Sequence, residues 1–578
     1  MIESTKKPLP RWLGWAAGTL AALAAAVCLG YYWRVFYYLD ARGVPGTKLC
    51  ALLCALALLA VAAAAAVKCL KTFAGRGAAC VFLCGLVFVF ASAPLQAPDE
   101  VQHYLRAYSI SQGHFDFDAA REYPADVAKL VESFPGAWIN SHTSKGLTTD
   151  RDTGEDTVYD TTGYALKQYG ENGRVQSLAD GFAAYQNGTP AKQSVKEPIL
   201  FMILPFAPQA LGILAARLLG FGALGCLYGG RVANLLVYAL ICRAALKRCA
   251  GHGPLFLAAA LCPLSLYMAA SMSYDAQLLA CYYLMAVLFA GQTFGKSEML
   301  LYLAAFGWAN MAKPWINLLW LILPLLHAKK NWRAPLKKWQ FAAAALLLAL
   351  GVNWLIEWYG GAFRYHYGTI GRMLDGVDQM PQLKFVLSNP LRFAAVLLGT
   401  LYENDFFIGQ LGIFGNLDLP VGVINTTAGA MLLLGAVLGE SRGPQTGLLR
   451  RAGAPVWCVV YLAGCMAAMY ITYTPVGMIR VIGLQARYFL PVFLLAFWAL
   501  AEAIGLKAQS AAQNQNIALA VFAAYGALSG LWCSSTLLLA QCIPSAEHTE
   551  KRGVKPCRIS QRSRRSESAG AHFWSLLP

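Results

Sequence analysis

Apolar runs of about 20 residues recur along this chain, and they limit what it can fold into more than any other feature. One is "AACVFLCGLVFVFA" at 78–91, and charged residues make up only 13% of the 578 residues, about half the share in a soluble protein. Only helices and closed barrels satisfy their backbone groups inside a bilayer. The sequence lacks the short alternating segments of a barrel. We therefore expect an all-α polytopic membrane protein.

The loops between the apolar runs set the expected topology. Lys and Arg cluster in short loops such as "AKKNWRAPLKKW" at 328–339, which the positive-inside rule places in the cytoplasm. Counted this way, the basic tail after Cys542 lies outside, so either one span is too many or the tail is atypical. The expected spans lie at about 12–33, 49–67, 78–93, 222–246, 255–270, 277–293, 299–312, 315–327, 341–357, 421–439, 455–472, 488–505 and 517–539.

These runs divide the chain into three parts. They are an N-terminal two-helix membrane segment at 1–77, a core of spans at 78–540 and a basic C-terminal tail at 541–578. Within the core we expect an extracytoplasmic loop at 98–196 with a small α/β or β insertion, interfacial helices at 197–221 and a second, polar outer segment at 358–420.

Charge and cysteine content exclude several functions. The net charge of +17 is spread over short loops, which argues against a nucleic-acid partner, and most of the 16 cysteines lie in apolar runs, where a thiol behaves as a small hydrophobe. The acidic stretch "TTDRDTGEDTVYDTTG" is explained better by a β-hairpin with Gly154 at its turn than by a calcium loop. No motif for ATP, nicotinamide or zinc occurs. No cofactor is therefore expected, and a divalent metal is possible but has no motif to support it.

A cluster of polar residues follows the third run. Pro98 can begin a helix whose first turn suits Asp99, and helical spacing then puts Asp99, His103 and Arg106 on one face, with Glu100 pointing elsewhere, toward the acceptor or solvent. An acid, an imidazole and a guanidinium together suit deprotonation of an acceptor hydroxyl beside a phosphate leaving group. The alternative is a capping Asp on a solvated polar face.

Three other motifs place polar residues at expected outer ends of spans. Tyr274 and Asp275 form a short tip, where Asp275 is either functional or an N-cap. Lys313 either snorkels to the interface or contacts a lipid phosphate.

The third of these motifs is "IGLQARYFLP", which brings Gln485, Arg487 and Tyr488 to a span. Its arginine suits a bidentate phosphate contact, although an aromatic-belt anchor is the other reading. For Arg231 and Asn234, hydrogen bonding between helices is the better explanation.

A family resemblance rests on six motifs in this order: "APDEVQHYLRAYSISQG", "GGRVANLL", "SMSYDA", "AKPW", "GIFGNLDLP" and "IGLQARYFLP". From about Ala93 to Pro491 the chain resembles a bacterial domain-of-unknown-function family of multispanning membrane proteins, which is grouped with the GT-C glycosyltransferases. Ala486 stands where that family more often has glycine. The first motif is also similar to the Asp-Glu signature of protein O-mannosyltransferases and of lipid A aminoarabinose transferases.

The resemblance implies a GT-C-like bundle of about 11–13 spans in the bacterial cytoplasmic membrane. It implies sugar transfer from a polyprenyl-phosphate (undecaprenyl-phosphate) donor to a cell-envelope glycan or protein acceptor at the outer face. The implied roles are catalysis for Asp99, Glu100 and His103, lipid-phosphate binding for Arg106, Lys313 and Arg487, and substrate binding for Tyr274, Asp275, Gln485 and Tyr488. A transporter or flippase of an envelope lipid or polysaccharide, or a polymerase or ligase, is the alternative.

Overall fold

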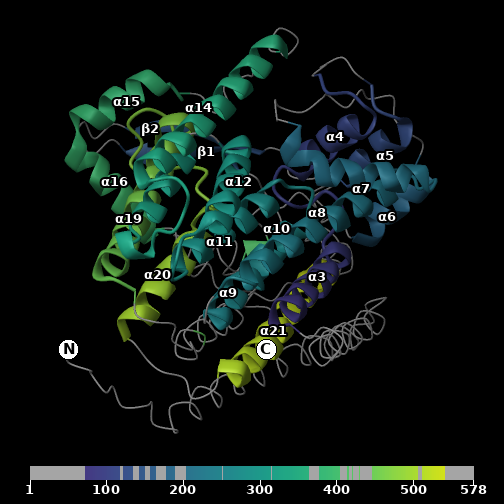
Figure 1. Cartoon of the computed structure of the whole chain (residues 1–578). Coiled ribbons are helices and arrows are strands. Elements are labelled where there is room, and N and C mark those ends of the chain that lie inside the picture. Colours follow the sequence, from purple (N-terminus) through teal and green to yellow (C-terminus); the bar gives the residue numbers. More distant parts are fainter. Residues whose placement is uncertain are drawn as a thin grey trace, which may run out of the picture.

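The computed structural model describes residues 72–116, 122–134, 142–149, 156–163, 178–188, 203–249, 252–313, 316–363, 376–403, 413–414, 419–420, 429, 436, 446–504 and 511–539. The predicted spans at 12–33 and 49–67, nearly all of 421–439 and the basic tail after Cys542 lie outside these residues. What is described is a bundle of helices (Figure 1).

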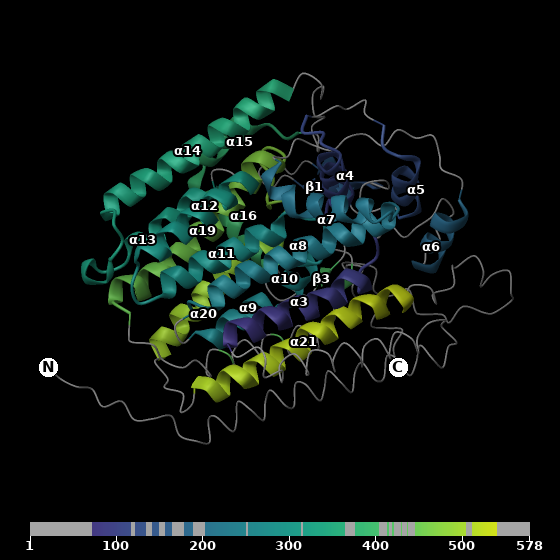
Figure 2. The ribbon, with the colours of Figure 1, turned by 45° about the vertical axis from the view of Figure 1, so that its right-hand side comes forward.

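Four helices are long and apolar enough to cross a membrane, and a bent pair described below makes a possible fifth. They are α3 (Phe73–Ala91), α8 (Ala223–Leu246), α14 (Lys338–Phe363) and α19 (Leu448–Tyr473). All four coincide with predicted spans, so a helical membrane protein is confirmed. Helix α3 lies beside α8 and α21 (Ala511–Leu539), and both views show α3 and α21 side by side (Figure 2).

Helix α14 has the surface of a helix in lipid. Trp339 near its start and Trp354 and Trp358 near its end are each more than half exposed. Nineteen residues separate the outermost pair, a rise of about 28 Å, close to the thickness of a bilayer core. Tryptophans at both ends of an apolar helix are typical of the two membrane interfaces.

Two of the predicted spans are not single continuous helices. The run at 255–270 is two short helices, α9 (Gly253–Ala260) and α10 (Pro263–Ala269). Cys262 has an extended backbone at the break, because the ring of Pro263 disfavours a helical conformation for the residue before it. The run at 315–327 contains η2 (Ile316–Leu321) and α13 (Ile322–Leu325), which together are too short to cross a bilayer.

The predicted hairpin around Lys313 is nevertheless present. Helix α12 (Lys296–Ala312) runs to Lys313, and the chain returns through η2 and α13 to η3 (Lys329–Asn331). Phe294 donates its backbone N–H to Asn331 O, and Arg333 N–H donates to Phe294 O. The two ends of the hairpin therefore lie together, and Lys313 lies at its far end.

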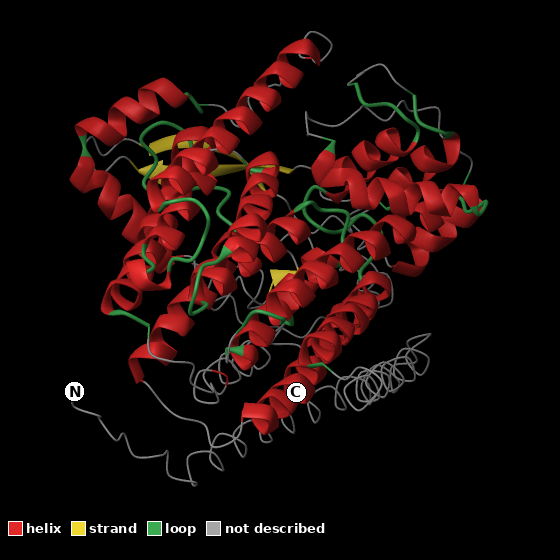
Figure 3. Ribbon diagram, viewed as in Figure 1, coloured by secondary structure: helices red, strands yellow, loops and turns green. Residues whose placement is uncertain are grey.

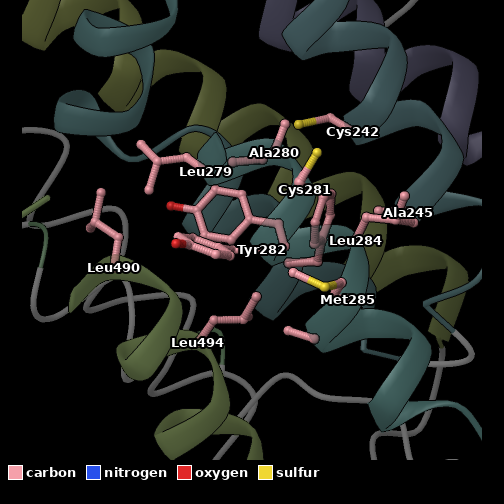
Figure 4. Close-up of a cluster of buried hydrophobic side chains, with 14 of the residues drawn as sticks. Cys242, Ala245, Leu279, Ala280, Cys281, Tyr282, Leu284, Met285, Leu490 and Leu494 are labelled. Carbon is pink, nitrogen blue, oxygen red and sulfur yellow. The ribbon is translucent and has the colours of Figure 1, made fainter. Parts of the chain in front are cut away.

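Helix α11 (Asp275–Ala290) runs through the middle of the bundle, packed on α8, α12 and α20 (Leu490–Ile504). All but the last of its residues are buried. Tyr282 lies between leucines of α11 and α20, with Leu279 and Leu490 nearby (Figure 4). Its ring stacks on Trp320 with centroids 5.0 Å apart. Helix α11 is thus the structural centre of the described bundle, and its first residue is Asp275.

The segment between α3 and α8 forms a separate hydrophobic cluster from α4 (Glu100–Ser111), α5 (Ala125–Ser133), η1 (Leu204–Phe206) and α7 (Ala207–Leu218). Helix α6 (Leu178–Asn187) packs on α5. Helix α7 lies against α8 at Gly212, where an added Cβ would lie 2.3 Å from Gly229 O. Its other side exposes Leu211 and Leu218. Helix α7 thus has one packed and one exposed apolar side, and the interfacial position expected for 197–221 stays a prediction.

Two short antiparallel sheets accompany the helices (Figure 3). Strands β1 (His142–Thr149) and β2 (Asp156–Gly163) pair with Thr149 opposite Asp156. The pairing agrees with the hairpin predicted there, whose turn residue Gly154 lies outside the described residues. Strands β3 (Ile413–Phe414) and β4 (Leu419–Pro420) form the other sheet.

Helices α15 (Gln379–Ser388) and α16 (Pro390–Glu403) occupy part of the segment predicted as polar, 358–420. Together they are apolar enough for one span but are bent by 106°. Leu387, Leu391 and Leu398 are more than two-thirds exposed on them. This part of 358–420 is therefore a bent apolar helix pair rather than a polar loop, because its apolar residues are divided between two short helices that meet at Asn389 and Pro390.

Basic side chains gather at one end of the bundle. Arg248 at the end of α8 reaches Glu298 in α12 at 4.0 Å, Arg450 at the start of α19 donates to Gly291 O after α11, and Lys338 at the start of α14 donates to Leu325 O. The end of α3, the starts of α8, α11 and α20 and the end of α12 therefore lie at the opposite end of the bundle.

Candidate active site

Asp99 has an unusual backbone. Its φ of 57° and ψ of 16° are left-handed, and α4 begins only at Glu100. Leu95 is the other described non-glycine residue with positive φ, so both lie in the loop between α3 and α4. Such conformations cost about 1–3 kcal/mol and cluster at functional sites.

The Asp99 side chain is exposed, and no hydrogen bond or ion pair joins its carboxylate to any residue that the structure describes. Asp99 therefore occupies the N-cap position of α4 without a side-chain capping hydrogen bond, and its exposure agrees with the solvated part of that alternative. A strained and exposed carboxylate without a structural partner is free to contact a ligand.

Glu100, by contrast, is fully buried and fully bonded. Both its oxygens accept from Arg231, Oε1 from Nε at 2.8 Å and Oε2 from Nη2 at 2.7 Å, and both residues are at most 1% exposed. Oε2 also accepts from Ala97 N at 3.1 Å and Oε1 from Met272 N at 3.0 Å. The expectation that Glu100 faces acceptor or solvent is wrong, because Arg231 of α8 takes it into the core.

A buried polar network fixes the tip that precedes Asp275. Asn234 of α8 donates to Ser271 O at 2.7 Å and to Ser273 O at 2.9 Å, and accepts from Gln277 at 2.7 Å. Gln209 of α7 donates to Met272 O at 3.2 Å. The interpretation of Arg231 and Asn234 as helix-bonding residues is confirmed, and their bonds hold the start of α11 in place.

Asp275 joins two motifs that are far apart in the sequence. Its Oδ2 lies 2.7 Å from Arg487 Nε, and its Oδ1 lies 3.2 Å from Lys313 Nζ. Burial raises the pKa of the Asp275 carboxyl, but the neighbouring cations outweigh this and hold it below its usual range. The three side chains together carry one net positive charge.

Lys313 is positioned by its own hairpin. Asn317 donates to the carbonyls of Ala309 and Lys313, and it accepts from Tyr282 at 2.5 Å. The Lys313 ammonium lies 3.9 Å from the centre of the Tyr488 ring and its side chain is 25% exposed. Because the ammonium is partly exposed, it can reach an anion that approaches the cluster.

Arg487 lies in η5 (Ala486–Phe489), at the start of α20, and is 6% exposed. Burial lowers its pKa, but Tyr488 and the carboxylates of Asp275 and Asp99 raise it more, so the guanidinium is charged. Gln485 precedes it, and its buried Oε1 has no hydrogen-bond partner among the described residues.

His103 lies near both Asp99 and Asp275, because the charges of both carboxylates act on it. Its ring contacts Phe206 of η1 and Tyr274, with centroid distances of 5.4 and 5.2 Å. Burial lowers the pKa of His103, although the nearby carboxylates of Asp99 and Asp275 oppose this. The imidazole is therefore neutral at pH 7.

Arg106 bonds to groups outside this cluster. It is 0% exposed, and its guanidinium donates to Asp116 O at 3.0 Å, Phe115 O at 3.2 Å and Tyr359 Oη at 2.9 Å. Gly113, with φ of 85°, turns the chain back so that these carbonyls reach it. The structure therefore does not bring Arg106 to Asp99, and its bonds attach the end of α4 to α14.

The structure thus brings seven of the ten predicted site residues into one neighbourhood. It directs the side chains of Glu100 and Arg106 to other partners, and Gln485 lies two residues before Arg487 with its buried Oε1 unpaired among the described residues. The seven are Asp99, His103, Tyr274, Asp275, Lys313, Arg487 and Tyr488. Sequence reasoning missed Phe206, Gln209 and Asn317, which position them. No motif in the sequence marks these three. Gln209 bonds to Met272, Phe206 packs on His103 and Asn317 accepts from Tyr282, and each of these partners lies 35 or more residues away.

The arrangement combines an exposed carboxylate with a cationic pair. The charge of Asp99 acts on His103 and Arg487, so the acidic and basic parts of the cluster are neighbours. Such a site can hold an anion on its cations while a carboxylate takes a proton beside it. Within the described part of the chain, no group of three or more His, Cys, Asp and Glu side chains gathers around a common point.

The chain matches a known protein family. The family described as "Predicted membrane protein (DUF2142)" matches residues 82–496, which include every residue of the cluster. No curated protein and no solved structure matches the chain.

Proposed function

The chain belongs to the DUF2142 family of predicted membrane proteins, and from that premise and the geometry of the cluster we propose that it is a membrane glycosyltransferase of GT-C type. The donor is a sugar linked to a polyprenyl phosphate, and the acceptor is a hydroxyl of a cell-envelope glycan or protein. The polyprenyl phosphate is the leaving group.

The observation that carries this proposal is the Asp275–Lys313–Arg487 trio, on whose Arg487 the charge of the exposed Asp99 acts. Asp275 neutralises one of two cations, so the remaining charge suits the single negative charge of a lipid phosphodiester. A guanidinium and an ammonium there stabilise the charge that grows on the departing phosphate. Asp99, exposed and without a structural partner, takes the proton of the acceptor hydroxyl.

The other residues have supporting roles in this proposal. His103 is neutral and shields the cluster together with Tyr274 and Phe206. Gln485 offers an unpaired amide oxygen to a sugar hydroxyl. Glu100 and Arg106 have their hydrogen-bonding groups directed into the protein, and we do not assign them to substrate.

The distribution of charge supports a membrane side for the site. The site lies at the end of the bundle opposite the basic end, and Lys and Arg favour the cytoplasmic side. We therefore propose that the site opens to the outer face of the cytoplasmic membrane, where lipid-linked donors are used without nucleotides. The exposed leucines of α7 would lie in the outer interface beside it.

The test is glycan analysis of a strain that lacks the gene and is complemented with variants. Wild type restores the missing sugar of an envelope polymer, and Asp99→Asn does not, although the variant is present in the membrane at the wild-type level. Glu122→Gln, a change of another exposed carboxylate in the first outer region, is the matched control and restores the sugar. Restoration of wild-type glycan by Asp99→Asn would exclude Asp99 as the base.

The same experiment separates the alternative. If the protein is a transporter or flippase, its loss leaves the lipid-linked donor unused at the inner side of the membrane. Such a protein does not need a carboxylate that accepts a proton from the acceptor. Retention of sugar transfer by Asp99→Asn, with loss in Lys313→Ala and Arg487→Ala, would favour lipid binding and transport over catalysis.

A further inference from the structure

Arg231 of α8 bonds to the end of α3, to the loop that follows it and to Glu100 of α4. In addition to its two bonds to Glu100, its guanidinium donates to Val89 O at 3.1 Å, Ser92 O at 3.2 Å and Ala93 O at 2.8 Å. These carbonyls belong to the last turn of α3 and to the loop that follows. Arg231 thus satisfies the end of α3, which would otherwise have unpaired carbonyls.

Glu100 makes the connection in the other direction. Its carboxylate accepts the backbone N–H of Ala97, which belongs to the strained loop, and the backbone N–H of Met272, which belongs to the tip before Asp275. Those two amides are 175 residues apart in the sequence. One side chain therefore holds both loops of the site, and Asp99 is its immediate neighbour in the chain.

We propose that Glu100 and Arg231 are positioning residues that fix the 92–99 loop and the 271–275 tip relative to each other. The left-handed backbone of Asp99 persists because Glu100 is anchored directly after it and Ala97 shortly before it. Asp275, and through it Lys313 and Arg487, is set by the bond to Met272. What is positioned is the catalytic arrangement of the proposed function, so the role of the pair in catalysis rests on that proposal, whereas the coupling of the two loops does not.

A buried carboxylate that accepts four hydrogen bonds has no capacity left for substrate. Loss of either member leaves the other charge buried without its partner. The pair should therefore act as a unit, so that Glu100→Gln and Arg231→Ala have similar effects on both loops and the double variant adds little to either.

The experiment is hydrogen–deuterium exchange with mass spectrometry on the full-length protein in lipid nanodiscs. We expect peptides that contain Ala97 and peptides that contain Met272 to exchange at least tenfold faster in Glu100→Gln and in Arg231→Ala. Glu100→Asp, which keeps the charge, should give a smaller increase at the same two places. An increase at one loop only, at neither, or equally over all helices would overturn the coupling.

Arg450→Ala is the matched control, because it removes another buried arginine, at the opposite end of the bundle, where it donates to Phe289 O and Gly291 O. It should raise exchange near 289–291 and leave both site loops unchanged. If Arg450→Ala also loosens the site loops, the coupling is not specific to the pair and the proposal fails.

Sugar transfer gives a second readout. Glu100→Asp should lower kcat without changing the donor concentration for half-maximal rate, whereas Asp99→Asn should abolish transfer without changing exchange. Coupled exchange without any loss of transfer would keep the structural coupling and contradict its role in catalysis. Loss of transfer in Asp99→Asn with no coupling in Glu100→Gln would keep the proposed function and reject this inference.

Discussion

Replacement of Asp275 by alanine tests whether the cationic cluster is built as the structure indicates. The change leaves Arg487 and Lys313 without their shared carboxylate. The Arg487 side chain is 7% exposed, and its Nε lies 2.7 Å from Asp275 Oδ2. The Lys313 side chain is 25% exposed, and its Nζ lies 3.2 Å from Asp275 Oδ1. Removing one partner of a buried pair costs about 3–5 kcal/mol, and a partly exposed pair contributes about 1 kcal/mol or less after solvent screening. We therefore expect Asp275→Ala to destabilise the fold by about 3–5 kcal/mol, mostly through Arg487.

Double-mutant cycles divide this cost between the two cations. The free energy of unfolding is measured by denaturant titration of the detergent-solubilised protein, for Asp275→Ala combined with Arg487→Ala and, separately, with Lys313→Ala. The coupling energy to Arg487 should exceed 2 kcal/mol, as a rough value, and that to Lys313 should be about 1 kcal/mol or less. Equal coupling to both, or a larger coupling to Lys313, would refute the unequal burial on which this reasoning depends.

Three further predictions follow from particular residues. Asp99→Gly removes the backbone strain of the left-handed conformation. In thermal unfolding, the free energy of unfolding of this variant should therefore be higher than that of wild type or within about 1 kcal/mol of it. The variant should nevertheless lose sugar transfer. Burial, Arg450 and Lys338 lower the pKa of His327 to about 3, so the unfolded state binds more protons than the folded state when the pH falls toward and below 6.5. Because of His327, the free energy of unfolding should be about 1.4 kcal/mol lower at pH 5.5 than at pH 7.5. Unfolding titrations of His327→Leu should not show this loss. Gly212→Ala should separate α7 from α8 and cost several kcal/mol, while Gly351→Ala, whose Cβ would meet nothing within 4 Å, should cost nothing; equal stability of the two variants would contradict the close packing.

The sequence was sufficient where a feature depends on neighbours along the chain. Length and apolarity predict α3, α8, α14 and α19, because a membrane helix satisfies its own backbone. Composition failed at 255–270, where Pro263 interrupts an apolar run, and at α15 and α16, where the apolar residues are divided between two short helices that meet at Pro390.

Site prediction failed where the answer depends on distant partners. Helical spacing placed Asp99 and Arg106 on one face, but Asp99 precedes the helix and the turn at Gly113 gives Arg106 other partners. Glu100 looked like a second functional carboxylate because nothing in the sequence shows that Arg231, 131 residues later, would bind it. The clustering of Asp275 with Lys313 and Arg487 was likewise visible only as three separate motifs.

The most direct test of the account is the amount of sugar-linked polyprenyl phosphate in membranes. Lipids from strains with wild-type protein, with no protein and with Asp99→Asn are extracted and quantified by mass spectrometry for every sugar attached to polyprenyl phosphate. If the protein transfers sugar from this donor, one such lipid accumulates in the strain without protein and in Asp99→Asn, and it returns to the wild-type level with Glu122→Gln. Identical amounts of all these lipids in every strain would contradict the proposed reaction.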